Sequence, residues 1–109
     1  MTDSLLVQLR KGVLDMCVLA MLAERDGYAY DIASRLAEDI GMGEGTIYPL
    51  MRRMQADGLV ETYLVESSAG PSRKYYRLTA AGRASLATQT QAWRSFAGAV
   101  QSILGEASA

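Results

Sequence analysis

The stretch from Val13 to Ala23 contains one polar residue, Asp15, and this limits what a chain of 109 residues can fold into. Apolar residues recur at steps of three and four from Leu5 onward, which predicts a helix from about Ser4 to Arg25. Because a small domain buries only one face of such a helix, we expect the other apolar face to pack against a second partner. Cys17 lies inside this stretch, and we interpret it as a small buried apolar residue with an unreactive thiol.

The composition removes several classes of chemistry. The chain has no histidine and one cysteine, so it cannot build a Cys₂His₂ or Cys₄ zinc site, an internal disulfide or a catalytic device that needs imidazole. Its carboxylates are scattered along predicted helices and no glycine-rich phosphate loop follows a strand, which predicts a non-enzyme without metal or cofactor. No apolar run approaches the roughly 20 residues of a membrane span, and residues 1–9 lack the features of a secretory signal. We therefore predict a soluble, cytoplasmic protein.

Two further helices are predicted in the first half of the chain. Apolar residues at steps of four predict one from Tyr28 to Ile40, and a similar spacing predicts the next from about Glu44 to Ala56. The second of these predicted helices contains Pro49, and a proline in a helix interior removes a backbone hydrogen bond. A helix that starts near Gly45 or Thr46 would keep this proline close to the first turn, where backbone donors lack intrahelical partners.

After residue 58 the helical spacing of apolar residues gives way to a composition typical of strands. Residues 59–66 and 72–78 are rich in Val, Tyr, Thr and Leu and are separated by residues 67–71, which predicts a β-hairpin with a mobile tip. Thr79 is the expected N-cap of a long last helix from about Ala80 to Leu104. The apolar residues of this helix are Leu86, Trp93, Phe96, Ala97, Val100, Ile103 and Leu104. Because their spacing is near seven and no domain follows, we expect them to pack against a second copy of the chain.

The charges are unevenly distributed along the sequence. Residues 1–44 carry four basic and eight acidic side chains, a net charge of −4, whereas residues 45–83 carry six basic and three acidic side chains, a net charge of +3. A local basic surface attracts a polyanion even when the whole chain does not. A solvated charged face would explain the same distribution, so the geometry has to decide.

Three helices followed by a two-stranded hairpin is the order of a winged helix-turn-helix, in which the third helix enters the major groove of DNA and the hairpin, or wing, lies along the backbone. The predicted fold is thus mainly α with a small β-hairpin (α+β). Gly43, Gly45 and Thr46 give the third helix a start with free amides and little bulk, which suits a phosphate. Glu44 would repel phosphate unless it turned away or accepted a hydrogen bond from cytosine.

Two side chains on one face of the third helix are candidate DNA contacts. Tyr48 and Arg52 stand four residues apart, and Arg52 could bind a guanine edge or clamp a phosphate; the sequence leaves both open. Arg53 points roughly 100° away and Asp57 follows four residues later, so a surface ion pair is the simpler interpretation of Arg53.

The wing carries its own candidates. Ser72, Arg73 and Lys74 follow the predicted tip and put charge where a hairpin would contact DNA, although lysine on an exposed strand also discourages aggregation. Strand alternation places Tyr76 in the core and Tyr75 on the opposite face, with Arg73.

Two segments of the chain carry a specific resemblance. Residues 44–54, EGTIYPLMRRM, followed by Asp57-Gly58-Leu59, and residues 70–82, GPSRKYYRLTAAG, closely resemble the PadR family of bacterial transcriptional regulators. Residues 28–32, YAYDI, are similar to the start of that family's second helix. The likeness runs from about residue 5 to residue 104. It implies a dimeric winged-helix repressor of the short subfamily, which binds a palindromic double-stranded DNA operator as a homodimer and is released by a small molecule.

The resemblance also implies that residues 1–109 form one domain with two functional parts. Residues 5–78 would form the DNA-binding winged helix-turn-helix and residues 79–105 the C-terminal dimerisation helix, with the first helix completing the dimer interface. Trp93 would stack on a small aromatic or hydrophobic effector, although plain packing between the two copies explains this tryptophan as well.

The residue pattern and the resemblance together give three sets of predicted site residues. The predicted DNA contacts are Tyr30, Gly45, Thr46, Tyr48, Pro49, Arg52, Arg53, Ser72, Arg73 and Lys74. The predicted ligand contacts are Val13, Met16, Trp93 and Phe96, and the predicted dimer contacts are Leu6, Leu9, Val13, Leu86, Trp93, Ala97, Val100 and Leu104. The alternative hypothesis is a winged-helix module that binds an acidic protein partner instead of DNA.

Overall fold

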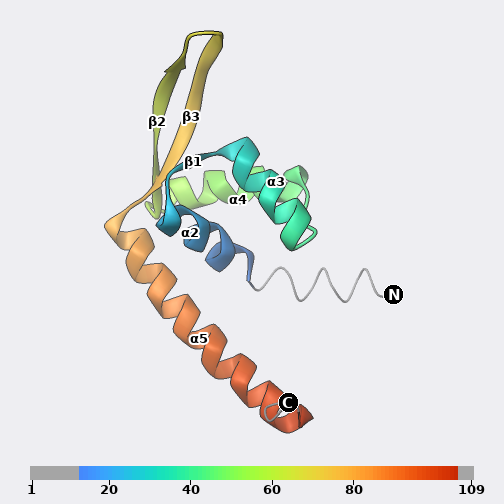
Figure 1. The fold of residues 1–109 in the computed structure, drawn as a ribbon. Coiled ribbons are helices and arrows are strands. Elements are labelled where there is room, and N and C mark those ends of the chain that lie inside the picture. Colours follow the sequence, from blue (N-terminus) through green and yellow to red (C-terminus); the bar gives the residue numbers. More distant parts are fainter. Residues whose placement is uncertain (1–12, 106–109) are drawn as a thin grey trace.

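A computed structural model describes residues 13–105 of the protein, and it shows helices arranged around one small sheet (Figure 1). The elements are, in chain order, α2 (Leu14–Glu24), β1 (Gly27–Tyr28), α3 (Ala29–Asp39), α4 (Glu44–Ala56), β2 (Val60–Ser67), β3 (Gly70–Leu78) and α5 (Ala80–Leu104). This is the α+β winged helix-turn-helix that the sequence predicts.

The helix bounds agree closely with the sequence pattern. α4 and α5 have the predicted bounds, and Thr79 caps α5 as expected by accepting a hydrogen bond from the backbone N–H of Gly82 at 3.0 Å. The expectation of one uninterrupted helix to Arg25 is wrong, because α2 begins at Leu14 after Val13, which is in a turn, and ends at Glu24. The predicted start near Ser4 lies outside the described residues. α3 begins at Ala29 instead of Tyr28 because Tyr28 belongs to a short strand.

Pro49 lies deeper in its helix than the sequence suggested. α4 begins at the predicted Glu44 and not at the later start near Gly45 or Thr46 that would accommodate the proline, so Pro49 falls in the second turn. A proline there removes the N–H that would bond to the carbonyl of Gly45 four residues earlier. Gly45 is exposed, so water can bond to this carbonyl in place of the missing N–H.

The sheet has the strand order β1-β3-β2 and is antiparallel throughout. β1 pairs Gly27 with Tyr76 and Tyr28 with Tyr75, so a strand of two residues, too short for any periodicity to reveal, fixes the hairpin to the helical body. β2 and β3 form the wing, which projects from the body in Figure 1. Only Ser68 and Ala69 remain in its turn, because both strands extend further than the predicted tip of residues 67–71 allowed.

The core lies between α2, α3, α4 and the base of the wing. Its buried side chains are Leu14, Val18, Leu19, Leu22, Ile32, Ala33, Leu36, Met42, Ile47, Leu50, Met51, Met54, Val60, Tyr76 and Leu78. Tyr76 is buried as predicted, whereas Cys17 is half-buried beside the core. Burial raises the pKa of the Cys17 thiol, which keeps the thiol protonated and unreactive.

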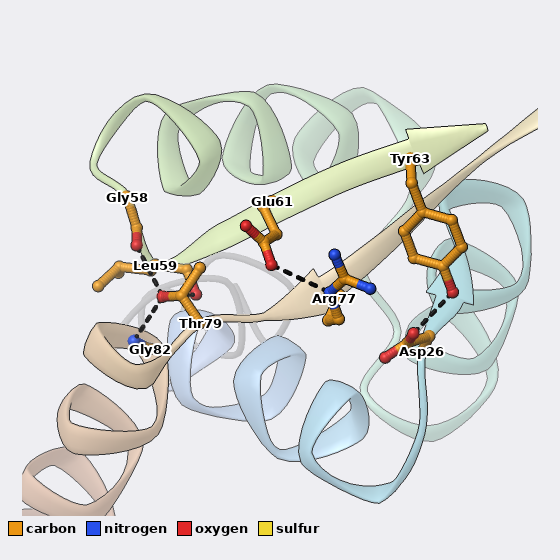
Figure 2. Close-up of polar contacts among 8 residues, drawn as sticks. All are labelled: Asp26, Gly58, Leu59, Glu61, Tyr63, Arg77, Thr79 and Gly82. Atoms are coloured by element: carbon orange, nitrogen blue, oxygen red, sulfur yellow. Dashed lines mark hydrogen bonds and ion pairs between the residues drawn. The ribbon is translucent and has the colours of Figure 1, made fainter.

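One tight junction joins α4, the wing and α5 (Figure 2). α4 ends at Ala56, and the chain turns away from it at Gly58, whose φ of +77° suits glycine. The Thr79 hydroxyl donates to the carbonyl oxygens of Gly58 at 2.7 Å and Leu59 at 3.0 Å. A Cβ on Gly82 would meet the carbonyl oxygen of Leu59 at 2.1 Å, so only glycine allows the first turn of α5 to pack this closely.

Beyond this junction α5 first runs along α2 and then extends past the body. Gly82 is the one buried residue of α5, and Figure 1 shows the helix running away from the body on the side opposite the wing. The apolar side chains of its outer half are exposed, among them Trp93, Phe96 and Ile103. None of the described helices, α5 included, is both long enough and apolar enough to cross a membrane.

Replacing Gly82 with alanine should lower the free energy of unfolding by about 1–3 kcal/mol, because the new methyl group must displace the backbone at Leu59. Gly98→Ala is the matched control. Gly98 lies in the same helix with nothing within 4 Å, so alanine there should raise stability by up to about 1 kcal/mol. Urea unfolding measures both variants, and equal changes would contradict the close approach at Gly82.

Candidate nucleic-acid interface

The start of α4 is open to an incoming ligand. Gly43 precedes the helix in an extended conformation and provides no side-chain cap, and residues 43–46 are exposed. A Cβ on Gly45 would meet nothing within 4 Å. The N–H groups of the first turn of a helix have no intrahelical acceptor and carry a partial positive charge. This end of α4 can therefore bind an anion through its backbone.

The two neighbouring arginines of α4 lie on different sides of the helix and have different partners. Arg52 is exposed and makes no ion pair with any residue of the described chain. Arg53 lies on the other side, where its guanidinium is 2.9 Å from Asp15 of α2 and 3.7 Å from Asp57. The predicted pair with Asp57 is present. The stronger partner, Asp15, was missed by sequence reasoning although it is the single polar residue of an apolar stretch.

The other predicted contacts of α4 lie on two sides of the helix. Thr46, Pro49 and Arg53 border a hollow of about 480 Å³ against Leu14 and Asp15 of α2. Tyr48 is half-buried on the side of the sheet, and its pKa is raised by burial, by Glu44 and by the nearby hydroxyls of Tyr30 and Tyr76. Thus Tyr30, which is exposed at the start of α3, and Tyr48 come together at one edge of the body.

The wing has two faces of different character. The register pairs Val60 with Leu78, Thr62 with Tyr76, and Leu64 with Lys74, so these residues share the inner face, which continues into the core. The Nζ of Lys74 lies 5.7 Å from the centroid of the Tyr76 ring. Gln55 of α4 donates a hydrogen bond to Thr62 at 3.4 Å. The inner face is therefore the side on which α4 packs.

The outer face carries a row of tyrosines, one from each strand. The Tyr63, Tyr75 and Tyr28 rings follow one another with centroids 5.8 and 5.6 Å apart, and Tyr30 continues the row at 6.3 Å from Tyr28. The Arg73 guanidinium lies 5.0 Å above the Tyr28 ring. Tyr75 and Arg73 share this face as predicted, but Arg73 stacks on the row and does not extend toward α4.

A short hydrogen bond anchors the tyrosine row (Figure 2). The Tyr63 hydroxyl donates to Asp26 at 2.6 Å, and this bond raises the pKa of Tyr63 most, followed by burial. Arg77 stacks on the Tyr63 ring at 4.9 Å and pairs with Glu61 at 3.0 Å. Sequence reasoning missed the bond between Tyr63 and Asp26, because the two residues are 37 positions apart and no local pattern connects them.

The predicted ligand and dimer residues of the described chain lie mostly along α5. Met16 of α2 and Gln89, Ala92, Trp93 and Phe96 of α5 line a hollow of about 270 Å³. Val13 is half-buried just before α2 and is not among these lining residues. Leu86 packs against the core of its own chain, which leaves less of it for a partner. Leu6 and Leu9 lie outside the described residues.

Comparisons with known proteins agree with this geometry. The model of the transcriptional regulator PadR-like family matches residues 18–88, which include α3, α4 and the wing. A protein from Lysinibacillus sphaericus that bears the name uncharacterized protein X is 31% identical over 87 residues, or 76% of this chain and 80% of its own length. The chain therefore belongs to the PadR-like family of transcriptional regulators.

Solved structures show the same architecture. The PadR-like transcriptional regulator from Bacillus cereus superposes with a TM-score of 0.82 at 37% identity and covers 89% of this chain and 96% of its own. A PadR family transcription regulator from Clostridium difficile gives a TM-score of 0.77 at 33% identity, over 84% of this chain and 98% of its own. The winged helix-turn-helix described above is thus the fold of known regulators.

The bond between Tyr63 and Asp26 gives a stability prediction. Tyr63→Phe should lower the free energy of unfolding by about 1 kcal/mol, the usual contribution of one hydrogen bond, while the ring stays in its row. Asp26→Ala should cost less in the Tyr63→Phe background than in the original chain, because the bond is already gone. Additive losses in urea unfolding would show that the two side chains do not act together.

Proposed function

We propose that the chain is a sequence-specific DNA-binding regulator that acts as a homodimer and represses transcription from a palindromic operator. The observation that carries this proposal is a set of neighbouring polar groups on α4 and the wing. The exposed Arg52 follows Tyr48 by one turn of α4, Tyr48 lies near Tyr30 and Tyr76, and the Nζ of Lys74 lies 5.7 Å from the centroid of the Tyr76 ring. No carboxylate within the described residues pairs with Arg52 or Lys74, so both cations are available to an external anion.

Double-stranded DNA fits this surface in shape and charge. The major groove, about 12 Å wide, admits one helix, and the backbone beside it presents a dense line of phosphates. α4 would enter the groove with Gly45 and Thr46 first, Arg52 would contact a guanine edge or a phosphate, and Lys74 would contact the backbone from the wing. Arg53 would take no direct part, since it joins α4 to α2 through Asp15.

The exposed outer half of α5 supports the dimer. Phe96 is 64% and Ile103 is 85% exposed, which is expensive for side chains of this size in water. Their spacing, together with that of Trp93 and Val100, forms a seam along one side of the helix. A two-fold dimer joined through this seam would present two copies of α4 to one DNA duplex, and a dimer that covers a promoter blocks transcription.

The hollow beside Trp93 is the proposed effector site. Its walls are a thioether, a tryptophan and a phenylalanine, and one amide, Gln89, provides polar contact. Such a site favours a flat, apolar molecule with a single polar group. Because Met16 follows Asp15 in α2, a molecule bound there would act on the helix that holds Arg53 of α4.

Trp93 is the one tryptophan of the chain, so its emission reports on the proposed effector site without a contribution from another tryptophan. Titration with 9-aminoacridine should quench this emission in a saturable manner and weaken DNA binding over the same concentration range. Phe96→Ala should reduce the affinity for the dye by removing one wall. Quenching that never saturates would contradict this part of the proposal, and so would a DNA affinity that does not change with the concentration of the dye.

A salt titration separates DNA binding from a protein-interaction role. The affinity for labelled DNA from upstream of the chain's own gene should fall linearly on a double logarithmic plot, with a slope of about −0.9 for each phosphate contacted. Arg52→Ala should weaken binding by about 5- to 150-fold. The loss will depend on one base pair if Arg52 reads guanine and will be uniform if it holds phosphate.

Arg94→Ala is the control for this charge change, because Arg94 is exposed on α5, away from α4 and the wing. It should leave the affinity nearly unchanged. Absence of DNA binding at low salt would instead favour the winged-helix module that binds an acidic protein, and equal effects of Arg52→Ala and Arg94→Ala would remove Arg52 from the interface.

A further inference from the structure

The wing exposes one large apolar side chain on its inner face. Leu64 is 70% exposed, although the next pairs toward the body on the same face, Thr62 with Tyr76 and Val60 with Leu78, close over the core. Directly opposite Leu64 in the register stands Lys74. An apolar side chain and a cation thus project side by side from the part of the wing that extends beyond the body.

Leu64 makes no evident contribution to the stability of the described chain. It belongs to neither the core nor the half-buried residues packed against it. The other exposed apolar residue of the wing, Val65, lies on the outer face opposite Arg73. An exposed leucine on a strand also favours aggregation, and a bound partner that covered it would remove this liability.

The outer face holds Leu64 in a fixed position relative to α4. The bond from Tyr63 to Asp26 and the tyrosine row attach β2 to β1, and Gln55 of α4 bonds to Thr62. Leu64 directly follows Tyr63 and lies two positions after Thr62 along β2. A wing that is held rigid in the free protein loses little conformational freedom when it binds.

We propose that Leu64 packs into the minor groove of bound DNA beside Lys74 and makes the chain prefer A·T pairs under the wing. This rests on the DNA binding proposed above. A duplex placed against α4 faces the inner side of the wing, and Lys74 favours the phosphates that border a groove. Apolar side chains are used by proteins to enter the minor groove, and there guanine adds an amine to the groove floor that a leucine side chain cannot satisfy.

A protein partner fits Leu64 less well than DNA does. A stable protein interface buries about 800 Å² on each side and needs a cluster of apolar residues at its centre. Leu64 is the one large exposed apolar residue on the inner face of the described wing, and its nearest exposed neighbour across the strand is charged. A single leucine beside a lysine suits a narrow groove between two lines of phosphates.

Selection of binding sites from a random pool of 40-bp duplexes tests the proposal. The original chain should enrich A·T pairs at two symmetric positions flanking its central half-sites. Leu64→Ser should keep the central preference, lose the flanking preference and bind the selected duplex roughly tenfold more weakly. Val65→Ser is the matched control on the opposite face and should behave as the original chain does. Unchanged melting temperatures will show that both variants are folded.

Base substitution then identifies the groove. Inosine–cytosine pairs lack the minor-groove amine of guanine–cytosine pairs but keep the same major-groove pattern. In the flanking positions they should bind the original chain as A·T pairs do, and G·C pairs should bind roughly tenfold more weakly.

Several outcomes would overturn the proposal. If Leu64→Ser selects the same flanks, or if inosine behaves as guanine, Leu64 does not read the minor groove. If Leu64→Ser changes the oligomeric state in sedimentation and not the selected sequence, the residue belongs to a contact between copies of the chain. If the original chain enriches no sequence at all, the proposed function itself fails, and this inference fails with it.

Discussion

The contact between Gly82 and the backbone at Leu59 sets the geometry on which the rest of the structure depends. Leu59 lies in the turn between α4 and β2, and Gly82 lies in the first turn of α5, so one close approach fixes the end of α4, the base of the wing and the direction of α5. The Thr79 hydroxyl binds the two sides of this junction together. Because α5 is held in this way, it runs along α2 and its far end extends away from the body (Figure 1).

Alternate residues along the strands of the wing face opposite sides, and the charged and aromatic side chains of the two faces have different roles. On the outer face, Tyr63, Tyr75, Tyr28 and Arg73 pack against one another and hold the wing to the body. On the inner face, the Nζ of Lys74 lies 5.7 Å from the centroid of the Tyr76 ring and pairs with no carboxylate of the described residues. In α4, Arg53 is bound to Asp15, whereas Arg52 is left open. Arg52 and Arg53 thus differ in role because the fold offers a carboxylate to Arg53 and, among the described residues, none to Arg52.

The parts of the fold that the sequence predicts well are those that depend on local pattern. α4 and α5 have the predicted bounds because the apolar periods of both helices, and the Thr79 cap of α5, are visible in the local sequence. β1 could not be predicted, since two residues carry no period, and the turn at Ser68 and Ala69 is shorter than its polar composition suggested. Pro49 shows that an exposed second turn tolerates the loss of one backbone donor.

The parts of the site that the sequence missed are pairings across long separations. Asp15 with Arg53 and Asp26 with Tyr63 join residues nearly 40 positions apart, and each pair forms only once the helices have packed. The sequence predicted a surface ion pair of Arg53 with Asp57 four residues later, and this pair is present. No local pattern revealed Asp15. Its ion pair with Arg53 joins α2 to α4, whereas the pair with Asp57 lies near the end of α4.

The central claim is that two chains joined through α5 present two copies of α4 to one face of a DNA duplex. Hydroxyl-radical footprinting on a selected site, with the protein mass on that DNA measured by sedimentation, tests it most directly. The account predicts two protected segments of two-fold symmetry, about 10 bp apart or a multiple of that spacing, and two chains on each duplex. A single unsymmetrical protected segment occupied by one chain would contradict it.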